Sequence, residues 1–263
     1  MSNHSDARRA MIRAAELAGE GLVRDFARLA TLPVSEKGPS DFVSSADIDA
    51  QRRITDELSA KFPGYGFLLE EEASLPAATV DARFIIDPLD GTTNFLRGIP
   101  HFSVSIALEV AGEIVVGVVL NPVQPELFWA EKNGGAWLGE RRLRVSPPST
   151  LARTVVGTGI PHLGRPDHAH FLGSIAKMMP EIGGIRRLGS AALDLAYVAA
   201  GRYDMFWERG LSPWDVAAAQ LLVTEAGGIV TKSNGAPMGI EDRDVLASNG
   251  AALHTKAIAW LAS

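Results

Sequence analysis

The chain has 263 residues, 46% of them hydrophobic, a formal net charge of −6 and no cysteine. This length and apolar content suit one large domain or two closely packed lobes, and they exclude a disordered chain. The lack of cysteine excludes disulfides, cysteine-based zinc sites and thiol nucleophiles. An acidic chain without a dominant basic patch is a poor nucleic-acid binder. With no signal-peptide pattern at the N-terminus and no apolar run of about 20 residues, we expect a cytoplasmic protein that does not enter a membrane.

Two helices are predicted at the start of the chain, followed by a strand. Apolar residues at helical spacing indicate helices over 6–30 and 47–62, with a polar loop over 35–45 between them. A short strand over 66–69 then leads into consecutive glutamates over 70–72, which a solvated acidic loop would also explain.

The next segment, 84–95, carries the densest group of chemically useful residues. Its first apolar residues predict the end of a buried strand, and Asp87 and Asp90 follow directly. Gly91 and Thr92 then indicate a turn into a helix. The same residue types form ordinary turns. Carboxylates beside free backbone N–H groups, however, can hold a hard cation and a phosphate together, so the segment is a candidate site.

The rest of the chain predicts first an antiparallel sheet and then alternating strands and helices. Residues 102–110 and 113–120 indicate a β-hairpin, followed by strands over 127–130 and 136–138. Later predicted strands are 154–158, 185–188, 203–207, 229–231 and 245–248, and later predicted helices are 170–179, 191–200, 213–226 and 252–262. This change predicts an N-terminal α+β lobe over 1–148 and a C-terminal α/β lobe over 149–263.

Other carboxylates stand at the predicted ends of elements, where sites usually form. Asp47 fits a helix N-cap, and Asp215 fits a capping box that starts at Ser212. Capping and metal binding are compatible, because a capping acid already points out of the helix N-terminus. Helix starts after Gly91, Gly189 and Ser212 would expose N–H groups that favour anions. Whether these starts converge is left open by the sequence.

These motifs resemble those of the inositol monophosphatase family of Mg²⁺-dependent, lithium-sensitive phosphatases. One family motif, Asp-Pro-(Ile/Leu)-Asp-Gly-Thr-Thr-Asn-Phe, stands at 87–95, and a second, Trp-Asp-x-Ala-Ala before Ala-Gly-Gly, stands at 214–218 and 226–228. An upstream family pattern matches Lys37, Asp41, Val43 and Asp47. The resemblance covers about 8–260. It implies an α/β fold, a layered αβαβα sandwich of the inositol monophosphatase and sugar phosphatase type, assembled as a homodimer.

The resemblance also implies metal ligands and catalytic residues. Two to three Mg²⁺ ions would be held by Glu70, Asp87, the Leu89 carbonyl, Asp90 and Asp215. Catalytic roles would fall to Glu70, Thr92 and Asp47, the last two orienting the attacking water. The chain departs from the family at Leu69, where the family has Gly. A slip of one residue there would make Glu71 the ligand in place of Glu70.

A substrate site follows from the same resemblance. Its residues would be Glu70, Leu89, Asp90, Gly91, Thr92, Arg186, Gly189, Ser190, Ala191, Glu208 and Asp215. The substrate would be a small phosphorylated polyol or amino alcohol. Glu208 could accept hydroxyl groups of inositol-1-phosphate, which we favour, or face the ammonium group of histidinol phosphate. Fructose-1,6-bisphosphate and phosphoadenosine phosphate are further alternatives.

Two hypotheses from other classes have less support. A non-catalytic regulatory protein that kept the fold would be marked by lost metal ligands, whereas all of these acids are present. A transition-metal site over 167–170 would rest on two histidines only two positions apart, and an exposed loop explains them as well.

Overall fold

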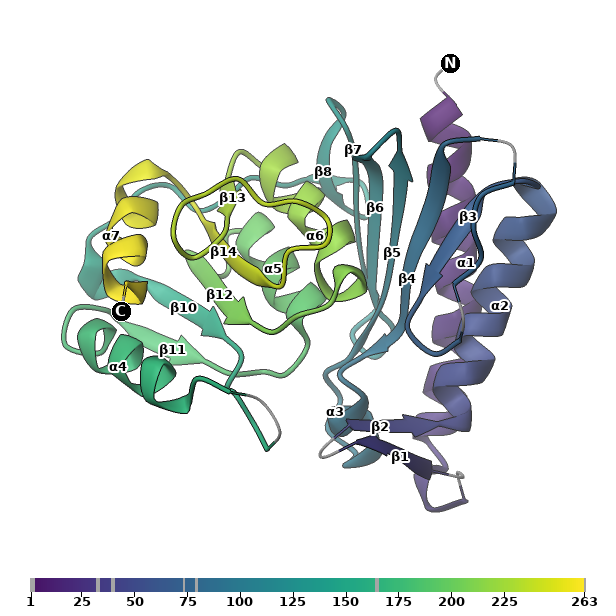
Figure 1. The fold of residues 1–263 in the computed structure, drawn as a ribbon, viewed down its shortest axis with the longest axis horizontal. Helices are drawn as coiled ribbons and strands as arrows, with labels where there is room; N and C mark the ends of the chain where they lie inside the picture. The colour runs from purple at the N-terminus through teal and green to yellow at the C-terminus, as the bar shows by residue number, and fades with distance from the viewer. Residues whose placement is uncertain are drawn as a thin grey trace.

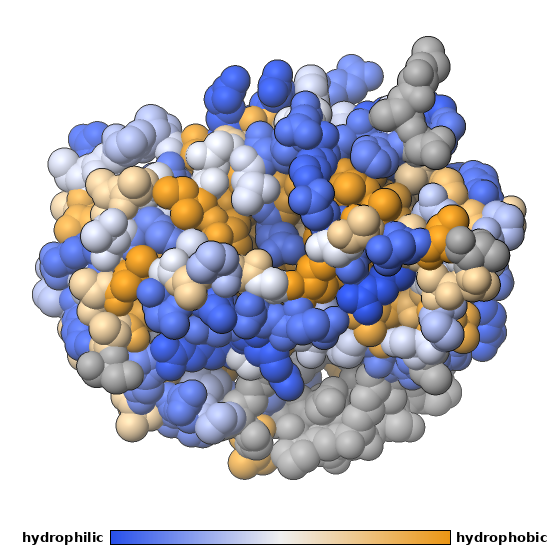
Figure 2. Space-filling view, turned by 45° about the horizontal axis from the view of Figure 1, so that its top comes forward, coloured by the Kyte–Doolittle hydropathy of each residue, from blue (hydrophilic) through white to orange (hydrophobic). Residues whose placement is uncertain are grey.

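Helices and β-sheets alternate in five layers in the computed structural model of the protein (Figure 1). The structure describes residues 3–31, 34–38, 41–72, 74–78, 80–163 and 166–262, with side chains described outside residue 3 and the range 31–43. No helix within these ranges is long and apolar enough to cross a membrane. Hydrophilic and hydrophobic residues are intermixed on the face shown in Figure 2.

The first two layers are a helix pair and a large sheet. Helices α1 (Asn3–Phe26) and α2 (Ser45–Lys61) pack on one face of a seven-stranded sheet, and the short helix α3 (Thr92–Leu96) follows its second strand. The strands in spatial order are β3 (Gly66–Leu69), β4 (Ala82–Asp90), β5 (Ser103–Val110), β6 (Glu113–Asn121), β7 (Glu126–Glu131), β8 (Gly135–Leu138) and β9 (Arg141–Arg142). Only β3 and β4 pair in parallel in this sheet.

The other layers are a central helix pair, a smaller sheet and an outer helix pair. Helices α5 (Ala191–Ala199) and α6 (Pro213–Glu225) lie between the sheets, and α4 (His168–Met178) and α7 (Ala251–Leu261) cover the far side (Figure 1). The five strands in spatial order are β11 (Gly184–Arg186), β10 (Val155–Thr158), β12 (Met205–Arg209), β14 (Asp244–Ser248) and β13 (Ile229–Thr231). Strand β10 is parallel to both of its neighbours.

Packing of α6 on the large sheet requires a glycine. A Cβ atom on Gly117 of β6 would lie 2.4 Å from the carbonyl oxygen of Ala218 in α6. The helix backbone therefore rests directly on the strand backbone. Buried apolar side chains fill the space around this contact, among them Phe128 and Leu222, which are fully buried.

Most of the predicted elements are confirmed, and some need correction. The helix predicted over 6–30 ends at Phe26, and the strand predicted over 185–188 spans Gly184–Arg186. The predicted polar loop over 35–45 is wrong, because the backbone forms an antiparallel pair of strands, β1 (Val34–Gly38) and β2 (Asp41–Ser44). The strand predicted over 203–207 lies two residues further along, because pairing with β14 extends as far as Arg209 and Asp244. The division into lobes at residue 148 stays a prediction.

A β-bulge shapes the end of β4. Asp87 pairs with Ser105 and Asp90 with Ser103, so the interval contains one more residue on β4 than on β5. In a regular strand, residues three positions apart point to opposite faces of the sheet. The extra residue reverses that relation and turns both carboxylates to the same side. Pro88, which has no N–H to donate, lies within the bulge, where a strand tolerates proline.

Candidate active site

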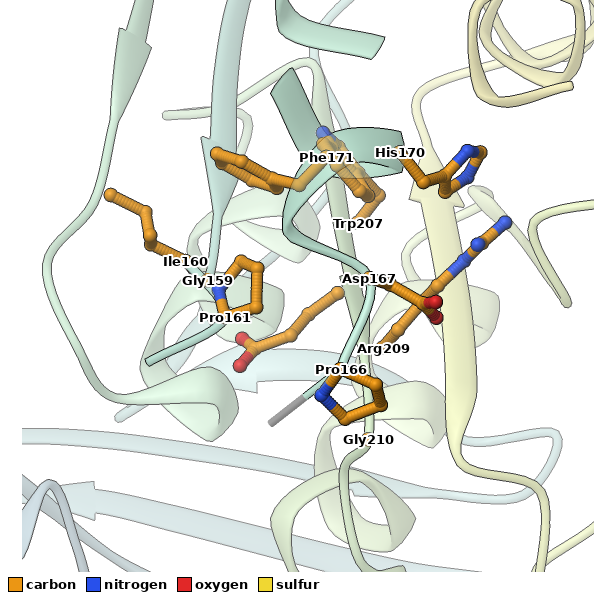
Figure 3. A pocket seen from close by; sticks show the side chains of 11 residues that line it. Gly159, Ile160, Pro161, Pro166, Asp167, His170, Phe171, Trp207, Arg209 and Gly210 are labelled. Atoms are coloured by element: carbon orange, nitrogen blue, oxygen red, sulfur yellow. The ribbon is translucent and has the colours of Figure 1, made fainter. Parts of the chain in front are cut away.

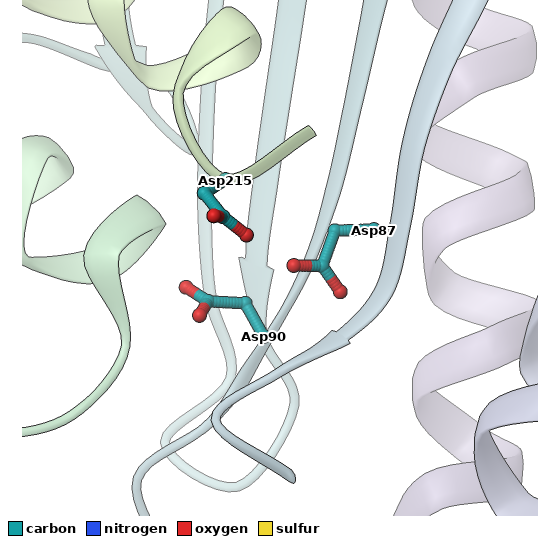
Figure 4. Close-up of side chains that lie close together, drawn as sticks. All are labelled: Asp87, Asp90 and Asp215. Carbon is teal, nitrogen blue, oxygen red and sulfur yellow. The ribbon is translucent and has the colours of Figure 1, made fainter. Parts of the chain in front are cut away.

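Three aspartates meet where the large sheet faces the central helices. One carboxylate oxygen each from Asp87, Asp90 and Asp215 lies within 4.8 Å of the other two. Figure 4 shows their side chains pointing toward one another, two from the end of β4 and one from the start of α6. Asp87 is 2% exposed, and the other two are half-buried. Within the described ranges, this is the group of three or more potential ligands that is close enough to bind one ion.

The electrostatics of this cluster favour a bound cation. Burial, then the neighbouring Glu70, Asp90 and Asp215, raise the pKa of Asp87 well above its ordinary value. Burial, then Asp215, raise the pKa of Asp90 to about 7. Carboxyl groups that resist ionisation because they lie close together are stabilised as anions by a positive charge among them. Hard oxygen ligands suit Mg²⁺, so these residues fit the ion that the sequence predicts.

The N-terminus of α5 holds Asp90 in place. Ser190, its N-cap residue, donates a hydrogen bond of 2.6 Å to Asp90 Oδ2, and the backbone N–H of Ala192 donates another of 2.8 Å. The hydroxyl group of Ser103 lies 3.1 Å from that of Ser190. These hydrogen bonds lower the pKa of Asp90 and partly offset the effect of burial.

Asp215 is held by the first turn of its own helix. Ser212 and Asp215 form a capping box at the start of α6, and the N–H of Ser212 donates to Asp215 Oδ2 at 2.7 Å. The predicted capping box is confirmed. Capping fixes one oxygen of Asp215 at a helix N-terminus, where the macrodipole stabilises negative charge.

A second capping acid lies beside the cluster. Asp47 forms a capping box with Ser44 at the start of α2, and it accepts a hydrogen bond of 3.3 Å from the hydroxyl of Thr92. That hydroxyl also lies 3.1 Å from the Leu89 carbonyl oxygen. Burial raises the pKa of Asp47, and hydrogen bonds from Ser44 and Thr92 lower it again. The structure therefore brings Asp47 and Thr92 within hydrogen-bonding distance of each other.

The structure bears on whether Glu70 or Glu71 lies at the aspartate cluster. The side chain of Glu70 shares a hydrogen bond with Asp87 and is the first acidic neighbour that raises the pKa of Asp87. The backbone N–H of Glu71 instead donates 3.0 Å to Gln51 Oε1 of α2, and Gln51 is fully buried. Gln51, which the sequence did not single out, therefore fixes the turn that follows β3 and presents Glu70 to the cluster.

Two glycine turns meet beside the aspartates. Gly91 has φ +99°, and a Cβ atom on it would lie 3.2 Å from the Gly189 carbonyl oxygen. Gly189 has φ +91°, and a Cβ atom on it would lie 2.3 Å from Nη1 of Arg187. Asn94 joins the two turns, because its Nδ2 donates to the Leu188 carbonyl at 2.8 Å. Two of the predicted helix starts therefore converge.

Two consecutive arginines, Arg186 and Arg187, lie in different surroundings. Arg186 is exposed at the end of β11, and its Nη1 donates to the Ile185 carbonyl oxygen at 3.0 Å. Arg187 is the arginine that lies against Gly189. Asn94 and Arg187 had no role in the prediction, although Asn94 stands inside the motif over 87–95. The side chains of Lys37 and Asp41 lie outside the described residues.

Glu208 stands near the cluster at the carboxyl edge of the small sheet. Burial raises the pKa of Asp194 well above its ordinary value, and Glu208 and Asp90 both raise it further, so both lie close to that residue. Glu208 also lines a pocket formed by the end of β10, the start of α4 and β12 (Figure 3). Phe171 stacks on Trp207 there with ring centroids 5.2 Å apart. The remaining lining residues are Gly159, Ile160, Pro161, Pro166, Asp167, His170, Arg209 and Gly210.

Comparison with known proteins identifies the family. Residues 4–263 match the model of the inositol monophosphatase family. The chain belongs to this family. It is 54% identical over 239 residues to the inositol-1-monophosphatase of Mesorhizobium japonicum, covering 91% of this chain and 90% of that protein. As a member of the inositol monophosphatase family it is a phosphatase, a phosphoric monoester hydrolase, which confirms the resemblance carried by the motifs.

Two further relatives match most of the chain. The solved structure of the extragenic suppressor protein suhB from Bartonella henselae superposes with a TM-score of 0.94 at 48% identity, covering 97% of this chain and 98% of that one. The layered fold is thereby confirmed. The protein named Nus factor SuhB of Pseudomonas aeruginosa is 43% identical over 242 residues, covering 90% of this chain and 89% of that protein.

Proposed function

We propose that the protein hydrolyses inositol-1-phosphate to inositol and phosphate with Mg²⁺ as cofactor. The observation that carries this proposal is the cluster of Asp87, Asp90 and Asp215, whose carboxylate oxygens lie within 4.8 Å of one another. The relative from Mesorhizobium japonicum, named inositol-1-monophosphatase, supports the choice of substrate. Histidinol phosphate, fructose-1,6-bisphosphate and phosphoadenosine phosphate are the competing substrates.

In this proposal the aspartates bind the cofactor together with Glu70 and the Leu89 carbonyl. Two to three Mg²⁺ ions would be held there. When bound, Mg²⁺ lowers the pKa of water and neutralises charge on the phosphate. The protein supplies a fixed set of oxygen atoms, because the capping and N-terminal hydrogen bonds of Asp90 and Asp215 hold one oxygen of each acid in place.

The chain's own groups would place the phosphate and the attacking water. Backbone N–H groups of Gly91 and Thr92 would donate to phosphate oxygens, as the positive φ of Gly91 turns the backbone at this point. The Thr92 hydroxyl, hydrogen-bonded to Asp47, would orient the water for attack opposite the leaving oxygen. The alcohol half of the substrate would be contacted by Gly189, Ser190, Ala191, Arg186 and Glu208.

The test is release of inorganic phosphate from a panel of monoesters. Inositol-1-phosphate, histidinol phosphate and fructose-1,6-bisphosphate are compared in Mg²⁺ and after removal of Mg²⁺ with EDTA. We expect turnover only with Mg²⁺ and the highest kcat/KM for inositol-1-phosphate. A higher value for another ester replaces the substrate. No release from any ester contradicts the proposal and supports the alternative of a non-catalytic regulatory protein.

Three further properties belong to the same proposal. Inhibition by Li⁺ is expected in the phosphate-release assay. A homodimer is expected in sedimentation analysis of the full chain. We also place the protein in the cytoplasm, which fractionation of the source cells would check.

A further inference from the structure

Glu208, the residue proposed to contact the alcohol half of the substrate, lies directly on Gly159. A Cβ atom built on Gly159 would lie 1.9 Å from Glu208 Cδ and 2.1 and 2.2 Å from its two carboxylate oxygens. These distances are far inside van der Waals contact. The carboxylate of Glu208 therefore occupies the space that any side chain at position 159 would take.

Backbone conformation does not explain glycine at this position. Gly159 is not one of the described glycines with positive φ, so an L-residue could adopt its backbone angles. The contact with Glu208 is the feature that excludes a side chain. Gly157, two residues earlier, is different, because a Cβ there would meet the rings of Tyr203 and Phe206 in the core.

The strands on both sides of this contact are firmly held. Thr158 of β10 pairs with Trp207 of β12, one residue before Gly159 and Glu208 in each strand. Thr158 is 1% exposed, and its hydroxyl group donates a hydrogen bond of 2.9 Å to the Trp207 carbonyl oxygen. Glu208 itself pairs with Val245 on the other side. A new side chain at 159 would therefore move the flexible end of Glu208 and leave the two backbones in place.

Both residues lie where parallel strands end. Strands β10 and β12 run in the same direction, and ligands of open α/β sheets bind outside the carboxyl ends of such strands. We infer that Gly159 is a positioning residue for alcohol recognition, because its missing side chain is what allows the Glu208 carboxylate to lie against β10 and face the substrate's hydroxyl groups. This inference rests on the proposed function, in which Glu208 accepts those hydroxyl groups.

The test compares Gly159→Ala with Gly173→Ala. Gly173 lies in α4 with nothing within 4 Å of its would-be Cβ, so its replacement controls for the added methyl group. Each protein is assayed in Mg²⁺ with inositol-1-phosphate and with p-nitrophenyl phosphate, whose alcohol half carries no hydroxyl to bind. For Gly159→Ala we expect KM for inositol-1-phosphate to rise about tenfold or more, the factor for losing a hydrogen bond to a charged acceptor. We expect kcat and the KM for p-nitrophenyl phosphate to change by less than about threefold, and Gly173→Ala to match the wild type.

A double-mutant cycle separates this role from general damage to the fold. In a Glu208→Ala background the carboxylate is gone, so Gly159→Ala should add no further rise in KM. A full additional rise, or an unchanged KM for Gly159→Ala alone, overturns the inference. Should Gly159→Ala fail to fold, Gly159→Ala/Glu208→Ala must restore folding, and its failure to do so also overturns the inference. Wild-type protein that releases no phosphate from inositol-1-phosphate contradicts the proposed function instead.

Discussion

Replacing Asp90 by Asn should stabilise the metal-free protein while strongly lowering its turnover. Burial and the neighbouring Asp215 raise the pKa of Asp90 from 3.8 to about 7. The folded protein therefore holds a proton that the unfolded chain has released at intermediate pH. The stability that this proton contributes is fully present below pH 3.8 and is lost as pH rises through about 7. At neutral pH and above, the metal-free fold bears the cost of an ionised Asp90 beside other acids.

The magnitude follows from the pKa interval. One pKa unit corresponds to about 1.4 kcal/mol, so the interval from 3.8 to about 7 corresponds to ~4 kcal/mol. Asn keeps an oxygen that can accept the hydrogen bonds from Ser190 and Ala192. Because Asp87 and Asp215 remain close together, we expect roughly half of the interval, ~2 kcal/mol, to be recovered. For a chain of this size that raises the unfolding midpoint by about 4–8 °C.

Thermal unfolding in EDTA, followed by circular dichroism, measures the stability gained by Asp90→Asn at about pH 7.5 and at about pH 4.5. At the lower pH the gain should shrink to less than ~1 kcal/mol. Saturating Mg²⁺, at about a hundred times its Kd, should stabilise the wild type by ~2.7 kcal/mol and Asp90→Asn by less. The variant's turnover should fall by about 10²-fold or more. Asp49→Asn, an exposed acid on α2, is the control and should change stability by less than ~0.5 kcal/mol. A metal-free Asp90→Asn protein no more stable than the wild type at pH 7.5, or a gain independent of pH, would refute the reasoning.

Three other predictions follow from particular contacts. Gly117→Ala should push α6 away from the large sheet and lower the free energy of unfolding, measured by chemical denaturation, by about 1–3 kcal/mol or more. Gly173→Ala, at a position of α4 with nothing within 4 Å of its would-be Cβ, should not destabilise the protein. Equal effects of the two substitutions would show that α6 does not rest on β6. Thr92→Ala should lower kcat by about 10²-fold, and Thr92→Ser, which keeps the hydroxyl, should restore most of it; failure of the serine variant to do so argues against a hydroxyl role. Glu70→Gln should weaken Mg²⁺ binding in calorimetry by about tenfold or more, and Glu71→Gln should weaken it less. The opposite order would make Glu71 the ligand in place of Glu70.

The secondary structure was largely readable because hydrophobic periodicity and turn residues are local. The strand over 66–69 and the helices after Ser190 and Ser212 begin where their spacing and capping residues indicate. The antiparallel strands β1 and β2 were missed because their residues are mostly polar and carry no alternating pattern. The end of β12 was missed because pairing with β14, distant in sequence, sets its length.

The candidate site was likewise predicted only in part. The resemblance of the motifs to those of the family implied Asp87, Asp90 and Asp215 as metal ligands, and carboxylate oxygens suit a hard cation. Only the structure shows the bulge that turns Asp87 and Asp90 to one side. Contacts between distant segments likewise became visible only in three dimensions, as with Glu208 against Gly159.

The sequence by itself determined the family, the elements and the acids, because each depends on residues near one another in the chain. The tertiary structure decided how those acids share one volume, how far their pKa values rise, and which backbone contacts leave room for them. These properties arise from burial and from the approach of charges that are far apart in the sequence, as with Asp90 and Asp215, which are 125 positions apart. No local pattern in the chain encodes them.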